Sequence, residues 1–155
     1  MPSTIRVQEA PFDLATEVAA LTGGRGDVGG LASFLGVCRG DGGLAAMTLE
    51  HYPGMTERAI ARIAEEAEAR WPLLGVTVIH RVGRLMPGEP IVLVLTASAH
   101  RAAALDSCAF LIDWLKTRAT FWKREEFADG TSRWVEAKES DDAAAARWGA
   151  LTAAQ

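Results

Sequence analysis

Apolar residues recur along this chain at spacings that predict helices in some segments and strands in others. Residues 4–8 alternate between apolar and polar positions, as a half-buried strand does. Helical spacing follows over residues 11–21 and returns in the longer segments 56–71 and 101–118. The alanine-rich stretch from residue 141 predicts a final helix.

Further strands are predicted where β-rich runs lie between turn-forming residues. They cover residues 28–39, 44–51, 76–80, 91–95, 121–124 and 133–137. The first two flank a turn-like Gly-Asp-Gly-Gly segment, and we expect them to pair as a hairpin. The last two flank Asp129 and Gly130 and should form a second hairpin.

No repeat, linker or low-complexity block divides the chain, so we expect one α+β domain over residues 1–155. Two long helices should cover a mixed sheet, with the second hairpin as an extension and residues 141–155 as a C-terminal helix and tail. A chain of 155 residues buries enough surface to need no disulfide or metal for its core.

Charge and cysteine usage narrow the function classes. The 16 basic and 20 acidic side chains give a net charge of −4, which argues against a surface devoted to nucleic acid or anionic lipid. Cys38 and Cys108 form neither a CxxC pair nor a dense framework, which suits a reducing compartment. The sequence shows no secretion-like leader and no long apolar span, so we expect a cytoplasmic protein.

The short motifs in this sequence do not by themselves identify a binding or catalytic function. Gly24, Gly26 and Gly29 satisfy GxGxxG, but a helix precedes them and a strand follows, the reverse of the dinucleotide-binding context, so we expect a loop. The three histidines are not spaced as zinc ligands, and no metal site is expected. Cys38 beside Arg39 could form an activated thiolate, although we favour the more common buried, inert thiol.

The predicted helix over residues 101–118 carries the most informative pattern. At about 100° per residue, the apolar stripe that contains Leu105 and Ile112 also contains Lys116. A lysine on a core-facing surface is costly unless it bends into water near the helix end, finds a partner, or lines a polar cavity. These alternatives remain open for Lys116.

A cluster of cations follows in this acidic chain. It consists of Lys116, Arg118, Lys123 and Arg124. With Phe121 and Trp122 interleaved, the cluster could stack bases and bind phosphates as single-strand binders do. It could equally form an enzyme pocket in which lysines bind phosphate and exchange protons. We expect Trp122 and Trp134 in the core of the second hairpin rather than as base platforms.

Five runs cover nearly the whole chain in order. They are LEHYPGM (49–55), HRVGRLMPGE (80–89), SAHR (98–101), DWLKTRATFWKRE (113–125) and RWVEAKESD (133–141). Together they resemble the large, catalytic subunit family of molybdopterin synthase. The resemblance implies an α/β-hammerhead-type fold and a sulfurtransferase of molybdenum cofactor biosynthesis.

The resemblance also implies partners and a reaction. In that family the large subunit forms a homodimer, and each copy receives a small ubiquitin-like sulfur-carrier subunit, which completes a heterotetramer. The carrier's C-terminal Gly-Gly thiocarboxylate enters a pocket that binds cyclic pyranopterin monophosphate, and two successive sulfur transfers give molybdopterin. No metal or redox cofactor, no nucleic acid and no membrane is implied. The alternatives are a non-catalytic module that binds anions or nucleic acid, and a scaffold for the small subunit.

Site residues follow from the family's motifs. The lysines of its LK and WK motifs fall on Lys116 and Lys123. The resemblance implies that Lys116 acts as general acid/base or as an amine that transiently attacks the acyl group of the tail, and that Lys123 stabilises charge and transfers protons. The resemblance also implies that substrate is bound by Val37, Cys38, Arg39, His100, Arg101, Arg124 and Glu125. Among these, Arg39, His100 and Arg101 can form charge-assisted hydrogen bonds with the phosphate of the substrate.

One spacing points to a shared site. Arg101 and Lys116 are separated by roughly 22 Å on one predicted helix, at 1.5 Å per residue. A small pterin cannot easily touch both from one subunit. If both serve the same site, His100 and Arg101 must come from the second subunit of the dimer.

Two positions depart from the family's pattern. Thr120 stands where proline is common, which leaves open how rigid the connection between Lys116 and Lys123 is. Lys138 stands where arginine is common. Its possible contact with the second subunit, and any bidentate phosphate contact, therefore remain open.

Overall fold

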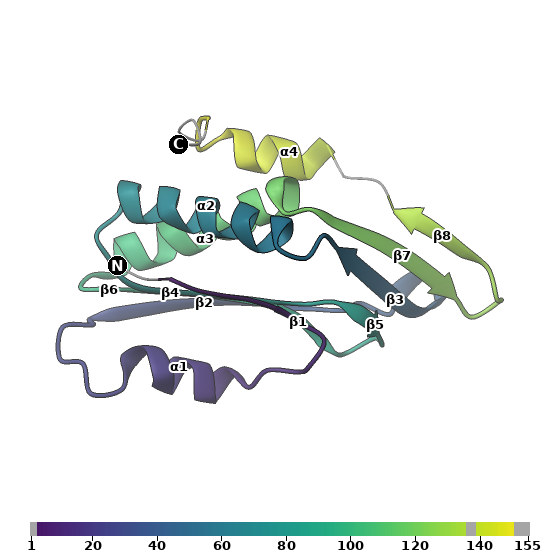
Figure 1. Cartoon of the computed structure of the whole chain (residues 1–155), viewed down its shortest axis with the longest axis horizontal. Helices are drawn as coiled ribbons and strands as arrows, with labels where there is room; N and C mark the ends of the chain where they lie inside the picture. Colours follow the sequence, from purple (N-terminus) through teal and green to yellow (C-terminus); the bar gives the residue numbers. More distant parts are fainter. Residues whose placement is uncertain (1–2, 136–138, 151–155) are drawn as a thin grey trace.

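The computed structural model describes residues 3–135 and 139–150. They form two four-stranded sheets, one of which has helices on both faces (Figure 1). The strands are β1 (Thr4–Gln8), β2 (Gly30–Val37), β3 (Leu44–His51), β4 (Leu73–Arg81), β5 (Gly83–Leu85), β6 (Pro90–Ser98), β7 (Phe121–Phe127) and β8 (Ser132–Val135). The helices are α1 (Leu14–Thr22), α2 (Met55–Arg70), α3 (Arg101–Arg118) and α4 (Glu139–Ala146), with a 3-10 turn at Asp41–Gly43. The predicted α+β class is confirmed.

The central sheet has the strand order β1-β4-β6-β2. β1 runs parallel to β4, whereas β4 with β6 and β6 with β2 are antiparallel, so the predicted mixed sheet is present. Helices α2 and α3 cover one face and α1 lies on the other (Figure 1). Because β4 and β6 are buried on both faces, they are continuous apolar runs rather than alternating ones.

The main core lies between the central sheet and the two long helices. Ile60 and Ile63 of α2 and Phe110 and Leu111 of α3 are almost wholly buried. Burial of each such side chain stabilises the fold by about 1.5–3 kcal/mol. A smaller cluster on the opposite face joins α1 to the sheet and contains Ile79, Leu93 and Leu95, with Phe12, Val18, Leu21 and Leu31 packed against it.

The outer sheet has the order β5-β3-β7-β8, and all its neighbours are antiparallel. It extends from one end of the molecule (Figure 1). The predicted hairpin of β7 and β8 is confirmed. The short strand β5 was not predicted, because three residues give too little pattern to recognise.

The predicted pairing of residues 28–39 with residues 44–51 is wrong. β2 pairs with β6 in the central sheet, while β3 pairs with β5 and β7 in the outer sheet. After β2 the chain does not fold back: the Cys38 N–H donates to the Glu89 carbonyl at 2.9 Å, and the Gly88 N–H donates to the Cys38 carbonyl at 2.8 Å. The glycine-rich turn therefore carries the chain from one sheet to the next.

Helix α4 confirms that a helix lies within the predicted C-terminal segment 141–155, whose residues 151–155 lie outside the described residues, and α4 is tied to α3. The Asp113 carboxylate accepts hydrogen bonds from Arg147 at 2.9 Å and from the Trp148 indole at 2.8 Å. Within the described residues, no helix is long and apolar enough to cross a membrane.

A buried hydroxyl fixes the connection between α3 and β7. The Thr56 Oγ1, at the start of α2, donates to the Thr120 carbonyl at 3.1 Å and lies 2.8 Å from the Thr120 Oγ1. It also accepts the Tyr52 N–H at 3.1 Å. Thr120 is therefore held by hydrogen bonds at the position where the related family commonly has proline.

Replacing Thr56 with valine tests this anchor. Thr56→Val keeps the shape but leaves buried polar partners unsatisfied, so we expect the free energy of unfolding to fall by about 1–3 kcal/mol. Urea denaturation measures the loss, and Thr117→Val is the control because the Thr117 hydroxyl bonds only within its own helix, to the Trp114 carbonyl. Equal losses in the two variants would contradict the assignment.

Candidate active site

A small cavity lies where the C-terminal part of α3 crosses the ends of β2, β4 and β6. Its volume is about 90 Å³. The lining residues are Gly36, Val37, His80, Ile91, Val92, Ile112, Leu115 and Lys116. Two of the predicted site residues, Val37 and Lys116, thus share one cavity. All other lining residues except His80 are aliphatic or glycine.

Lys116 lines this cavity but is exposed, so its predicted place on the core-facing stripe of α3 is wrong. Leu105, the reference for that stripe, is 59% exposed. The buried face is centred on Phe110, Leu111 and Trp114, roughly half a turn away. The exposed Leu105 misaligned the predicted stripe, and Lys116 lines a largely aliphatic cavity rather than the polar cavity considered.

Cys38, Lys123 and Glu125 gather beside this region. Lys123 and Glu125 lie opposite Leu49 and Met47 of β3, whose side chains form an apolar cluster with Cys38. Burial raises the pKa of the Cys38 thiol, the charge of Glu89 raises it further, and Lys123 opposes the shift. Cys38 is therefore a buried thiol, and the activated-thiolate alternative is not supported.

The cations predicted to bind phosphate are spread over separate places. Arg39, just after β2, is exposed, with its Nε 3.7 Å from the Asp41 carboxylate. His100 and Arg101 are exposed at the opposite end of α3 from Lys116. Within one subunit, His100 and Arg101 therefore lie far from Lys116, which is what their spacing along the sequence indicated. Lys138 lies outside the described residues.

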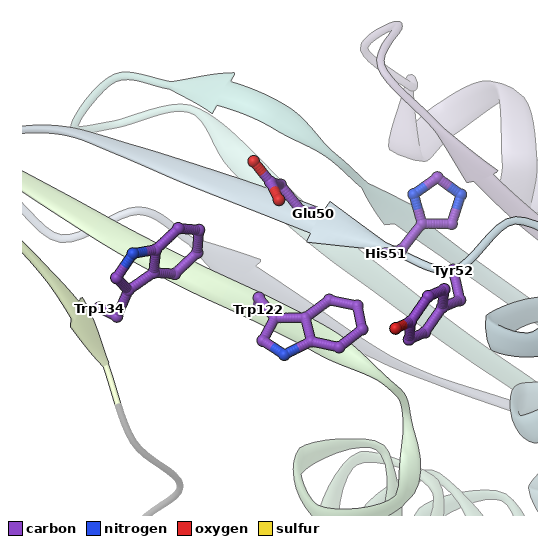
Figure 2. A pocket seen from close by; sticks show the side chains of 5 residues that line it. All are labelled: Glu50, His51, Tyr52, Trp122 and Trp134. Atoms are coloured by element: carbon purple, nitrogen blue, oxygen red, sulfur yellow. The ribbon is translucent and has the colours of Figure 1, made fainter.

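A larger, open pocket of about 370 Å³ lies on the other side of the outer sheet (Figure 2). It is lined by Glu50, His51, Tyr52, Trp122 and Trp134. Arg124 belongs to this side, because it alternates with Lys123 along β7 and pairs across the strands with Trp134. The structure therefore separates Arg124 from the two residues that flank it.

The predicted core positions of Trp122 and Trp134 are wrong. Trp122 is 41% exposed and Trp134 is 56% exposed. Tyr52 packs edge-on against Trp122 with ring centroids 4.6 Å apart. The alternation of side chains along β7 could have indicated this. Because Phe121 faces the apolar cluster, Trp122 must face the opposite side of the sheet.

His80 is the site residue that the sequence did not reveal. Its ring stacks on Phe121 with centroids 3.9 Å apart, and its Nδ1 lies 2.9 Å from the Arg81 carbonyl. Burial lowers the pKa of His80 to about 4; the hydrogen bond to the Arg81 carbonyl opposes this shift, and the nearby charges of Lys116 and His51 add to it. The imidazole is therefore neutral at physiological pH. Nothing in the spacing of the histidines indicated this.

Comparisons with known proteins agree with this architecture. The family model described as MoaE protein matches residues 7–118, and the chain belongs to that family. The molybdopterin synthase catalytic subunit of Mesorhizobium japonicum is 59% identical over 147 residues, which cover 94% of this chain and 92% of that protein. The family prediction is confirmed.

Solved structures show the same fold. The molybdopterin biosynthesis MoaE protein from Burkholderia ambifaria has a TM-score of 0.84 at 53% identity, covering 96% of this chain and 99% of that one. A complex of subunits 1 and 2 of molybdopterin-converting factor from Helicobacter pylori has a TM-score of 0.68, covering 87% and 90%, but at 17% identity it shows the fold alone.

The lowered pKa of the half-buried His80 makes stability depend on pH. The pKa of His80 is about 4 in the folded protein, against an ordinary value of 6.5, so the unfolded chain binds the proton first. Stability is therefore full above pH 6.5 and falls as the pH drops towards 4, by at most about 3 kcal/mol. Urea denaturation from pH 7 to pH 4 should show a smaller loss for His80→Phe. Equal losses would contradict this.

Proposed function

We propose that this chain is the catalytic subunit of a molybdopterin synthase, working in the cytoplasm. It would transfer two sulfurs from the thiocarboxylated C-terminus of a small ubiquitin-like carrier to cyclic pyranopterin monophosphate. The observation that carries the proposal is the amine of Lys116 at a cavity whose other lining residues, apart from His80, are aliphatic or glycine, with Lys123 on the neighbouring sheet. The names of the relatives at more than half identity support it.

Two lysines on different elements suit acyl and sulfur chemistry. Lys116 lies in the last turn of a helix whose packing fixes its backbone, and its amine can exchange protons or attack the acyl carbon of the carrier tail. Lys123 lies on β7, two strands from the edge strand β5, and can stabilise the negative charge that develops on oxygen or sulfur. The Thr56–Thr120 contacts hold the connection between these two lysines.

The phosphate-binding residues require a second copy of the chain. β2 is an edge strand of the central sheet, with exposed Phe34 and Leu35. Its beginning lies against the start of α3, because a Cβ added to Gly30 would be 3.3 Å from the Arg101 Cα. Its end, at Val37, lines the Lys116 cavity.

Antiparallel pairing of two β2 edges would exchange these ends. The beginning of one β2 would then lie beside the end of the other, as two-fold symmetry requires. His100 and Arg101 of the second copy would approach Lys116 and the nearby Arg39. Pairing would also cover an unpaired apolar edge, which native proteins avoid exposing. The homodimer is thus part of the proposed site.

Loss of the Lys116 amine tests the function. Lys116→Ala should lower molybdopterin formation at least about a hundredfold in a reconstituted assay, while the thiocarboxylated carrier still binds. Arg118→Ala is the matched control: this cation lies on the same helix and stacks on Trp114, outside the cavity. No product from the wild type, with carrier binding retained, would favour the scaffold alternative.

The exposed Trp122 and Trp134 favour one other function, a surface that binds single-stranded nucleic acid. Such a module would lose affinity in a graded, salt-dependent way when any of Lys116, Arg118, Lys123 or Arg124 is replaced. An enzyme should instead depend sharply on Lys116 and not on Arg118.

Mixing two inactive variants tests the shared site. In dimers that combine one Lys116→Ala chain with one Arg101→Ala chain, one of the two composite sites is intact. Random assembly should therefore restore about one quarter of wild-type turnover. Co-refolded Lys116→Ala and Lys123→Ala chains are the control and should restore none, because both lysines act from the same subunit. Absence of rescue in the first mixture would overturn the composite site.

A further inference from the structure

The cavity beside Lys116 contains one other polar side chain. Apart from His80 and Lys116, its described lining residues are aliphatic or glycine. An amine that turns into such a space needs a hydrogen-bond acceptor, since an unpaired polar group in apolar surroundings is costly. His80 is the lining side chain that can supply one.

The orientation of the His80 ring is fixed on two sides. Stacking on Phe121, at an interplanar angle of 23°, sets its plane. The Arg81 carbonyl, 2.9 Å from Nδ1, can only accept, so Nδ1 carries the hydrogen and Nε2 keeps its lone pair. The Arg81 side chain is itself held by the Glu9 carbonyl, at 2.9 Å and 3.1 Å.

We propose that His80 is the positioning residue of Lys116, with its Nε2 accepting a hydrogen bond from the Lys116 Nζ inside the cavity. The inference rests on the proposed function, in which Lys116 is the reacting amine. A hydrogen bond through one N–H restricts rotation about the terminal C–N bond. The rest of the Nζ group is then directed away from His80, towards the substrate.

The surroundings keep this acceptor available. The charged or titratable groups near His80 are Lys116 from α3 and His51 from β3, while β7 contributes the uncharged ring of Phe121. A protonated His80 would repel the Lys116 ammonium and lose its lone pair. Because the pKa of His80 is about 4, the ring stays neutral at physiological pH.

Nitrogen NMR of the imidazole tests the contact without any activity measurement. In ¹⁵N-histidine-labelled protein, we expect His80 to show the Nδ1–H tautomer, with the Nε2 resonance shifted upfield by the bond from Lys116. Lys116→Ala should move that resonance back downfield, and Arg118→Ala should leave it in place. An Nε2 resonance that is the same in wild type and Lys116→Ala would overturn the proposal.

Two conservative variants separate positioning from structure. Asparagine can place an amide N–H near Nδ1 and so keep the bond to the Arg81 carbonyl, but it has no atom near Nε2. Glutamine can place an oxygen near Nε2. We expect His80→Asn to lower kcat about 10- to 100-fold with little change in KM, and His80→Gln to retain kcat within about threefold. Equal losses, or no loss in His80→Asn, would overturn the proposal.

These results are independent of the proposed function. If Lys116→Ala kept full turnover, the function assigned to Lys116 would fail, while the NMR experiment would still decide whether the contact exists. If Lys116→Ala abolished turnover and His80→Asn did not affect it, only the positioning role would fail.

Discussion

The packing of α3 across the central sheet determines where the chemistry can occur. Phe110 and Leu111 are fully buried against the sheet, and Trp114 is nearly so, which leaves the helix no freedom to slide or turn. Its C-terminal end therefore delivers Lys116 to a fixed point beside β2. Because Thr56 holds Thr120 two residues beyond the helix, the start of β7, and with it Lys123, is fixed from the same reference.

Local pattern was enough to predict most elements. Residues 4–8 and 101–118 agree with the structure at both ends, because strand alternation and helical spacing are local properties. Strand pairing is not a local property. The partner of β2 is β6, which is distant in the sequence, and no turn motif connects the two strands directly. The buried face of α3 was predicted wrongly for a related reason. Leu105 is apolar yet exposed, and Ser107 is polar yet buried, so composition alone misplaces the helix.

The residues of the candidate site were likewise predictable from the sequence only in part. Sequence resemblance supplied Lys116, Lys123 and the cations proposed to bind phosphate, because these residues lie in recognisable runs. It did not supply His80, whose proposed role depends on Phe121 and the Arg81 carbonyl meeting around one ring. The exposed tryptophans were missed because aromatic residues in a hairpin are more often buried, and only the register of the outer sheet decides which side they face.

The burial of Cys38 bears on how such a site handles sulfur. The thiol lies in the apolar cluster of Met47 and Leu49, near Lys123, and burial raises its pKa. A protonated thiol is a poor nucleophile, whereas a thiolate could attack the acyl carbon of the thiocarboxylated tail, which would form a thioester with Cys38 and release hydrosulfide. The protein thus carries a cysteine close to the two lysines proposed to be catalytic, and burial keeps that cysteine from competing with them as a nucleophile.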